Sequence, residues 1–480
     1  MIRNAGLSCA LNIYRAAIQL GLTIVLAHFL APAEFGLVAL LLPITLFLLL
    51  VGDMGLTSAI VSRATDSREA GAAASLCLAF GIAVPLVMLA LHVAGALPFL
   101  PPCSAGLLLA FGCVATLAMA AVVPRAMLES RLLYGRITAI ETVANMVAFA
   151  VAIAGAAQGA GAWSFALYHL VMQAGRAGGL GVAARHDFDL SLDWRQARPL
   201  LQLGGWIAAF NIVNFLMRNF DRYIIAAWLG TDALGLYALA YQVMLVPMMI
   251  VTWPLSAVLV ATLGRLKPQP EAQRETFLAM LTLASCITLP AMTFVALFSD
   301  LLFAAILPAR WAAAADITGL LAIAGGLQSV TAFLGVLFLA QGRVRAQFWF
   351  GAAATLVTLA TLALCAALTG SLPLLALAYA ILTAALSVFY LLMMARLLQS
   401  SMREIAARLA PAIALGIVAG ATALAADGLI THWSPAARLT GVMLAFGVVI
   451  LSVLVLRRAT LARLIGILQN AGRVTRPAAV

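Results

Sequence analysis

Charged residues are scarce in this chain of 480 residues, of which Asp, Glu, Lys and Arg make up 9%. Hydrophobic residues make up 65%, and the mean hydropathy is +1.09. A soluble globular domain has about 25% charged residues, so this composition excludes one. The sequence also lacks a phosphate-binding P-loop, a nucleophile elbow and a zinc motif. We therefore expect no catalytic residue, no metal and no cofactor.

Cysteine is sparse as well, and its spacing contains no CxxC pair and no metal-ligand pattern. The six cysteines are scattered, mostly inside apolar runs: Cys9, Cys77, Cys103, Cys113, Cys286 and Cys365. We expect no disulfide bonds.

Long apolar runs are abundant, and about fourteen of them can span the roughly 30 Å of hydrocarbon in a bilayer. They cover 7–30, 36–61, 72–94, 104–123, 137–157, 163–183, 203–229, 234–263, 277–298, 317–340, 348–368, 372–395, 409–426 and 439–456. The first run has a basic start like a secretory signal, but its polar residues argue that it is retained as a span. We predict an all-α polytopic membrane protein.

Lysine and arginine are distributed unevenly along the chain, which carries a net charge of +11. With the N-terminus placed inside, only Arg310 and Arg438 fall in outside loops, which is the positive-inside pattern. This pattern supports an even number of spans with both termini in the cytoplasm. It also attributes the basic balance to topology and to attraction by anionic lipid headgroups, not to nucleic acid.

Two of the spans carry the same polar stripe at an offset of 199 residues. Asn12, Arg15, Gln19 and Thr23 share one helical face, and their counterparts at that offset are Asn211, Asn214, Arg218 and Arg222. The register continues from Gly36-Leu37 to Gly235-Leu236. We infer an internal duplication, with an N-lobe of spans 1–6 (1–195) and a C-lobe of spans 7–12 (196–400). Spans 13–14 and a basic tail (401–480) follow.

The stripes contain three arginines, and each costs about 2.5–3.5 kcal/mol to insert at the centre of a membrane helix. Arg15, Arg218 and Arg222 are therefore expected to line a wet cleft between two pseudo-symmetric six-helix lobes. The asparagines and Gln19 have two open interpretations. They can line the cleft, or they can form interhelical hydrogen bonds worth about 0.6 kcal/mol each, which explain them equally well. Asp221 lies close to Arg218 and Arg222 and can simply neutralise them.

Other polar residues and prolines in the spans have plainer interpretations. Asp53 can face the cleft or cap a helix end toward water, and we favour the cap. Glu141 lies near the cytoplasmic surface, and we expect it to snorkel. Pro43 lies in one span, and Pro247 and Pro254 lie in its partner of the other repeat, where these prolines are either hinges or static kinks.

A family resemblance appears in the run Leu26 to Leu37, followed by Asp53-Met54-Gly55-Leu56. It resembles the opening of bacterial polysaccharide-type flippases, members of the multidrug/oligosaccharidyl-lipid/polysaccharide exporter superfamily. Further motifs of that family are similar to Arg218-Asn219-Phe220-Asp221-Arg222, Leu234-Gly235-Leu236-Tyr237, Leu307-Pro308-Ala309-Arg310-Trp311 and Gln341-Gly342-Arg343. The resemblance covers about the first 400 residues.

The resemblance implies a V-shaped transporter with alternating access. Its cargo would be a polyprenyl-pyrophosphate-linked oligosaccharide, moved across the cytoplasmic membrane for exopolysaccharide or lipopolysaccharide biosynthesis. Arginine suits the pyrophosphate, and asparagine and glutamine suit sugar hydroxyls. A polysaccharide polymerase and glycosyltransferases of the same pathway are candidate partners, besides membrane lipid.

Three alternatives remain at this stage. A peptidoglycan precursor flippase would also need a cationic cleft. A cation-coupled multidrug exporter should carry buried carboxylates in its cleft, whereas the stripes are net positive. A membrane glycosyltransferase or polymerase generally needs a sizeable catalytic loop, but the outside loops at 31–35, 158–162 and 230–233 are very short.

Overall fold

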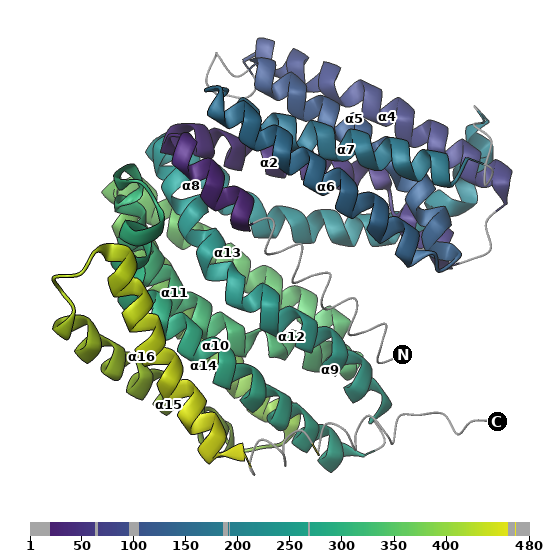
Figure 1. Cartoon of the computed structure of the whole chain (residues 1–480). Helices are drawn as coiled ribbons and strands as arrows, with labels where there is room; N and C mark the ends of the chain where they lie inside the picture. Colours follow the sequence, from purple (N-terminus) through teal and green to yellow (C-terminus); the bar gives the residue numbers. More distant parts are fainter. Residues whose placement is uncertain are drawn as a thin grey trace. The chain divides into compact units, whose positions relative to one another are not determined.

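The fold is described from a computed structural model, which covers residues 20–62, 66–95, 105–185, 191, 193–266, 269–458 and 466. Over these ranges every regular element is helical (Figure 1). Where the structure describes them, the fourteen predicted spans lie on helix apart from short turns, such as the one at Met54 and Gly55. Eleven helices of the described part are long and apolar enough to cross a membrane. The predicted all-α polytopic class is confirmed.

The residues Val25–Gly235 form one compact unit by their contacts. It contains α2 (Pro32–Asp53), α3 (Leu56–Ser62), α4 (Ser67–Val93), α5 (Ala105–Ser130), α6 (Tyr134–Ala157), α7 (Trp163–Ala183), the 3-10 turn η2 (Trp194–Ala197) and the first part of α8 (Arg198–Pro247). Helix α5 lies at its centre, because it packs against α2, α3, α4 and α7. Its apolar residues are buried on several faces, as expected for a central helix.

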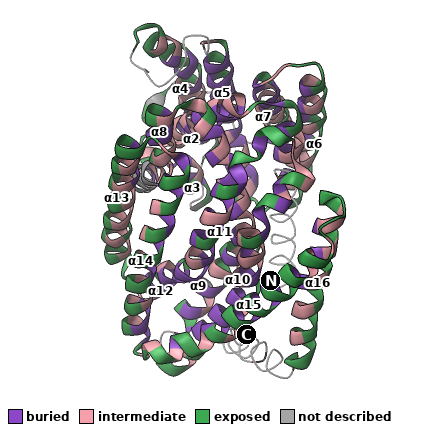
Figure 2. Ribbon diagram, turned by 90° about the vertical axis from the view of Figure 1, so that its left-hand side faces the viewer, coloured by how far each residue is buried: buried purple, intermediate pink, exposed green. Residues whose placement is uncertain are grey.

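The second unit joins the chain up to Ile24 to the chain from Leu236 onward. It contains the rest of α8, the π-helix η3 (Met248–Thr252), α9 (Trp253–Arg265), α10 (Pro270–Ile306), the 3-10 turn η4 (Ala309–Trp311), α11 (Ala313–Thr331), α12 (Phe333–Ala340), α13 (Val344–Thr369), α14 (Leu372–Leu398), α15 (Met402–Leu429) and α16 (Pro435–Leu456). Helix α10 packs against α9, α11, α15 and α16. Few residues of α13 and α16 are buried, so these helices form its periphery (Figure 2).

These units are groups of contacting helices and not sequence repeats, so the lobe boundaries at 195 and 400 stay predictions. The two spans that the predicted repeat makes equivalent both contain a helix break. Helix α2 ends at Asp53, and an offset of 199 leads to Thr252, where the π-helix ends. Met54 and Gly55, with φ of 47° and 73°, make the first break. Pro247 precedes the second break, because its missing N–H cannot continue an α-helical ladder. Both spans are thus interrupted, by a turn at Met54 and Gly55 in the first and by the π-helix Met248–Thr252 in the second.

A close contact within the Val25–Gly235 unit joins the starts of the equivalent spans. A Cβ atom at Gly36 would lie 1.8 Å from the carbonyl oxygen of Thr231, and one at Gly235 would lie 1.9 Å from that of Pro32. Pro32 and Thr231 are themselves 199 residues apart. The contact is therefore reciprocal, which is the pattern of a local two-fold axis.

Helix α8 contains the junction between two predicted spans. Its continuous helical path is interrupted at Gly230, with φ of 86° and ψ of 177°. This region of backbone space is essentially restricted to glycine. The outside loop predicted at 230–233 is thus reduced to a sharp turn at one residue.

Candidate functional site

The structure describes part of the predicted cleft. Asn12, Arg15 and Gln19 lie outside the described residues, as do the side chains of Asn214 and Arg218. Asn211, Asp221 and Arg222 are half-buried on α8. Their assignment to a substrate cleft stays a prediction.

Thr23, the last residue of the first stripe, is buried within the unit that continues at Leu236. Its hydroxyl oxygen accepts a hydrogen bond from Gln242 Nε2 at 2.9 Å. Gln242 lies on the second part of α8, and the sequence had not singled it out. Thr23 therefore makes a hydrogen bond between helices. This is the structural role that the sequence analysis gave as the alternative to substrate binding for the asparagines and Gln19.

A charged pocket lies within the Val25–Gly235 unit, between α2, α5 and α7. Its volume is about 360 Å³, and its lining contains Leu46, Leu49, Leu50, Asp53, Thr57, Ala118, Ala121, Val122, Arg125, Glu129, Gln173 and Arg176. Aliphatic side chains form one part of the wall and ionisable side chains the other. Such a mixture suits a ligand with both polar and apolar parts.

The break after α2 places Asp53 at this pocket. The backbone reverses hand at Met54 and Gly55, so α3 starts as a new helix at Leu56. The Asp53 carboxylate accepts hydrogen bonds from the Thr57 backbone N–H at 3.2 Å and from its hydroxyl at 2.5 Å. This satisfies an orphan amide of the new helix. Asp53 thus caps a helix, as favoured from the sequence, and also lines the pocket.

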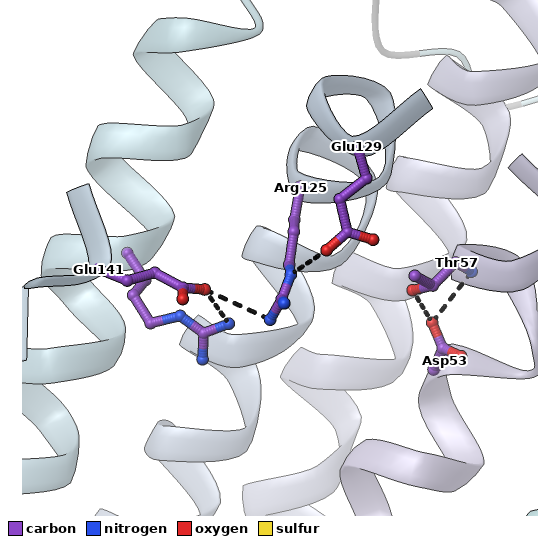
Figure 3. A network of polar contacts seen from close by, with 6 residues as sticks. Asp53, Thr57, Arg125, Glu129 and Glu141 are labelled. Atoms are coloured by element: carbon purple, nitrogen blue, oxygen red, sulfur yellow. Dashed lines mark hydrogen bonds and ion pairs between the residues drawn. The ribbon is translucent and has the colours of Figure 1, made fainter. Parts of the chain in front are cut away.

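Arg125 and Arg176 share one carboxylate. Arg125 Nε lies 2.8 Å from Glu129 Oε1, and its Nη1 lies 3.3 Å from Glu141 Oε1. Arg176 Nη2 lies 3.1 Å from the same oxygen, and Arg176 Nη1 donates to Gln173 Oε1 at 2.9 Å. Figure 3 shows Arg125 between Glu129 and Glu141, with Asp53 and Thr57 beside them.

The expected snorkelling of Glu141 is wrong. Its side chain is only 11% exposed and lies between the two arginines. A carboxylate that turned toward water would give up its ion pairs with both guanidinium groups, of which that of Arg176 is only 20% exposed. Pairing between helices therefore prevails over the short distance to the surface.

The charges of this pocket are balanced and not cationic. Its lining contains two arginines, Arg125 and Arg176, and two carboxylates, Asp53 and Glu129, while Glu141 pairs with both arginines from outside the lining. The excess positive charge predicted for the cleft is thus absent from this described pocket. Its groups offer donors and acceptors together, which suits hydroxyl-rich ligands.

Sequence reasoning did not select Arg125, Glu129, Gln173 or Arg176. Signals for them existed. Arg176 falls inside the predicted span 163–183, three residues after Gln173, and Arg125 stands four residues before Glu129. Charges inside a span face the bundle interior or a partner, and spacings of three and four residues bring side chains together on a helix.

Comparison with known proteins identifies the family to which this chain is similar. A family model described as polysaccharide biosynthesis protein matches residues 25–316, which is more than half of the chain. The lipopolysaccharide biosynthesis protein WzxC of Escherichia coli (strain K12) is 27% identical over 342 residues, or 68% of this chain and 67% of that protein. The succinoglycan biosynthesis transport protein ExoT of Rhizobium meliloti (strain 1021) is 24% identical over 306 residues, or 63% of this chain and 62% of that protein.

Among solved structures, the lipid II flippase MurJ in an inward closed conformation matches with a TM-score of 0.71. The match covers 95% of this chain and 99% of that chain at 10% identity. At this identity the likeness shows the fold alone, which agrees with the fold that the motifs imply. The family resemblance noted in the sequence is confirmed, and the chain belongs to the polysaccharide biosynthesis protein family.

Proposed function

We propose that this protein is a flippase that moves a polyprenyl-pyrophosphate-linked oligosaccharide across the bacterial inner membrane. Membership of the polysaccharide biosynthesis family carries this proposal. The transport activity in the name of ExoT and the flippase fold of MurJ support it. Exopolysaccharide or lipopolysaccharide biosynthesis is the pathway, since WzxC and ExoT are named for such polymers.

The oligosaccharide is the hydrophilic part of this cargo, and it must cross the hydrocarbon layer without losing all its hydrogen bonds. The balanced pocket of α2, α5 and α7 supplies them, since Asp53 accepts and Arg125 and Arg176 both donate. We assign this pocket to sugar binding in the half of the cycle that opens to the cytoplasm.

The pyrophosphate needs a different partner. We assign it to Arg15, Arg218 and Arg222, whose planar guanidinium groups bind phosphate oxygens in pairs. Asp221 limits the excess positive charge, so that release remains fast. The asparagines of the stripes and Gln19 contact the first sugar. The polyprenyl tail stays in the lipid.

Export of polysaccharide by cells that carry Arg218→Ala or Arg15→Ala tests this assignment. We expect export to fall at least about tenfold for each, the equivalent of about 1.4 kcal/mol, with membrane protein levels near wild type by immunoblot. Arg218→Lys should rescue little, because a single ammonium cannot replace the guanidinium fork. Arg345→Ala removes one exposed arginine elsewhere and is the control. Normal export by the Arg218 and Arg15 variants would refute the cationic site.

The multidrug exporter alternative is tested in the same strains. A drug exporter would change the resistance of cells to cationic dyes when Glu129 or Glu141 is neutralised, because buried carboxylates would be its cation site. We expect unchanged resistance, since Glu129 and Glu141 are already paired with arginines.

A further inference from the structure

A second pocket lies within the second unit, in its part after Leu236, at the ends of the helices. Its volume is about 380 Å³. The walls come from the first turn of α10, the turn between α12 and α13, and the last turn of α14. The lining contains Pro270, Gln273, Arg274, Gln341, Arg343, Arg396, Leu397, Leu398 and Gln399.

This pocket is cationic. Three of its lining side chains are arginines, and no carboxylate lines it. Arg274 pairs with Glu404 at the start of α15. Arg343 and Arg396 have no carboxylate within ion-pair distance in the described part of the chain, and both are exposed. Two positive charges are therefore available to an incoming anion.

Two amide side chains hold the walls together. Gln341 Nε2 donates to the Leu397 carbonyl at 2.9 Å and connects the turn after α12 to the end of α14. Gln273 Nε2 donates to the Leu263 carbonyl at 3.0 Å and connects α10 to α9. The pocket is thus preorganised, which reduces the entropy lost on binding. The N-terminus of α10 adds the partial positive charge of its helix dipole.

Exposed apolar side chains lie near the pocket on helix α13. Helix α13 starts beside it at Val344, and Trp349 is 70% exposed about 9 Å further along the helix from Arg343. Tryptophan favours the headgroup level of a bilayer. Beyond it, Leu356 and Leu364 are 70% and 61% exposed, and few side chains of α13 are buried. Exposed apolar side chains that can contact acyl chains therefore begin within two turns of Arg343.

We propose that this pocket binds the phosphate of an anionic phospholipid headgroup, with Arg343 and Arg396 as its direct ligands. Arg274 is already paired with Glu404 and is not a direct ligand. Free phosphate has the same chemistry, but it would gain nothing from the exposed face of α13. The site is separate from the cargo site proposed above. The lipid would be a resident partner of this unit and not its substrate.

Native mass spectrometry of the purified full chain in detergent, with added phosphatidylglycerol or phosphatidylcholine, tests the proposal. We expect phosphatidylglycerol to bind more tightly. Each of Arg343→Gln and Arg396→Gln should weaken it about fivefold, and the double variant about thirtyfold, from the usual contribution of a basic side chain at a lipid surface. All variants change exposed residues and should elute as monodisperse protein.

Arg345→Gln is the matched control, because Arg345 is exposed two residues from Arg343 but does not line the pocket. It should change binding less than twofold. An equal loss in this control, or no preference for phosphatidylglycerol, would overturn the site. Inorganic phosphate at millimolar concentration should not displace the lipid, and its binding as tightly as phosphatidylglycerol would assign the pocket to a soluble anion and overturn the lipid assignment.

Discussion

At the scale of single residues, two features constrain this chain most strongly. Gly36 and Gly235 have backbone carbonyl groups where a Cβ atom would stand. Glu141 holds two arginines from two neighbouring helices with one oxygen. Both constraints join residues of different helices.

Replacing Gly36 with Ala should strongly destabilise the protein. The new methyl group would meet the Thr231 carbonyl, and backbone cannot swing away as a side chain can, so we expect a loss of about 3 kcal/mol or more. Thermal unfolding in detergent measures it. Gly178→Ala is the control, because nothing lies within 4 Å of a Cβ atom there. Equal unfolding temperatures for the two variants would contradict the contact.

Neutralising Glu141 should lower the stability of the protein more than neutralising Glu129. Glu141→Gln leaves Arg125 and Arg176 without their shared charge, and we expect a loss of about 1–2 kcal/mol of stability, less than for a fully buried pair because the two arginines are 35% and 20% exposed. Glu129→Gln removes only a pair on one helix, worth about 0.5 kcal/mol. Chemical denaturation of both variants gives the comparison, and a larger effect at Glu129 would refute the assigned hierarchy.

At the scale of elements, the spans were predictable and the partners of their charges were not. Hydropathy over about twenty residues is a local property of the sequence, and in a bilayer it nearly dictates helix. By contrast, Arg125, Glu141 and Arg176 come from three helices, so their pairing depends on how those helices pack. The sequence showed Arg176 inside a span but not which carboxylate would meet it. The stripe helices were predicted as spans, yet their cleft role remains to be tested.

Gly230 offers a test of an element boundary. Its φ of 86° and ψ of 177° separate the two halves of α8, and no atom lies within 4 Å of a Cβ position. The cost of Gly230→Ala is therefore conformational and not steric, about 1–3 kcal/mol. We expect a lower unfolding temperature than for Gly264→Ala, a control without close neighbours. An unchanged temperature would mean that the turn is not required.

At the scale of the whole molecule, the predicted topology gives an expectation for each terminus and for the junction of the repeats. The uneven distribution of arginines between the two sides of the membrane predicts that reporters fused after Arg198 and after Arg476 are both cytoplasmic. Alkaline phosphatase should be inactive and green fluorescent protein bright at both positions. A periplasmic reporter at the second position would mean an odd number of spans.

The reciprocal contact of Gly36 with Thr231 and of Gly235 with Pro32 also bears on how such a chain can arise. In a homodimer of a shorter chain, these two contacts would be one contact, made twice by the same glycine across the symmetry axis. A single mutation there would be doubled in every dimer. Gene fusion turns that one codon into two, which can then drift separately. The polar stripes have done so, since Gln19 is matched by Arg218. The glycines have not, because each still faces the backbone of the other copy.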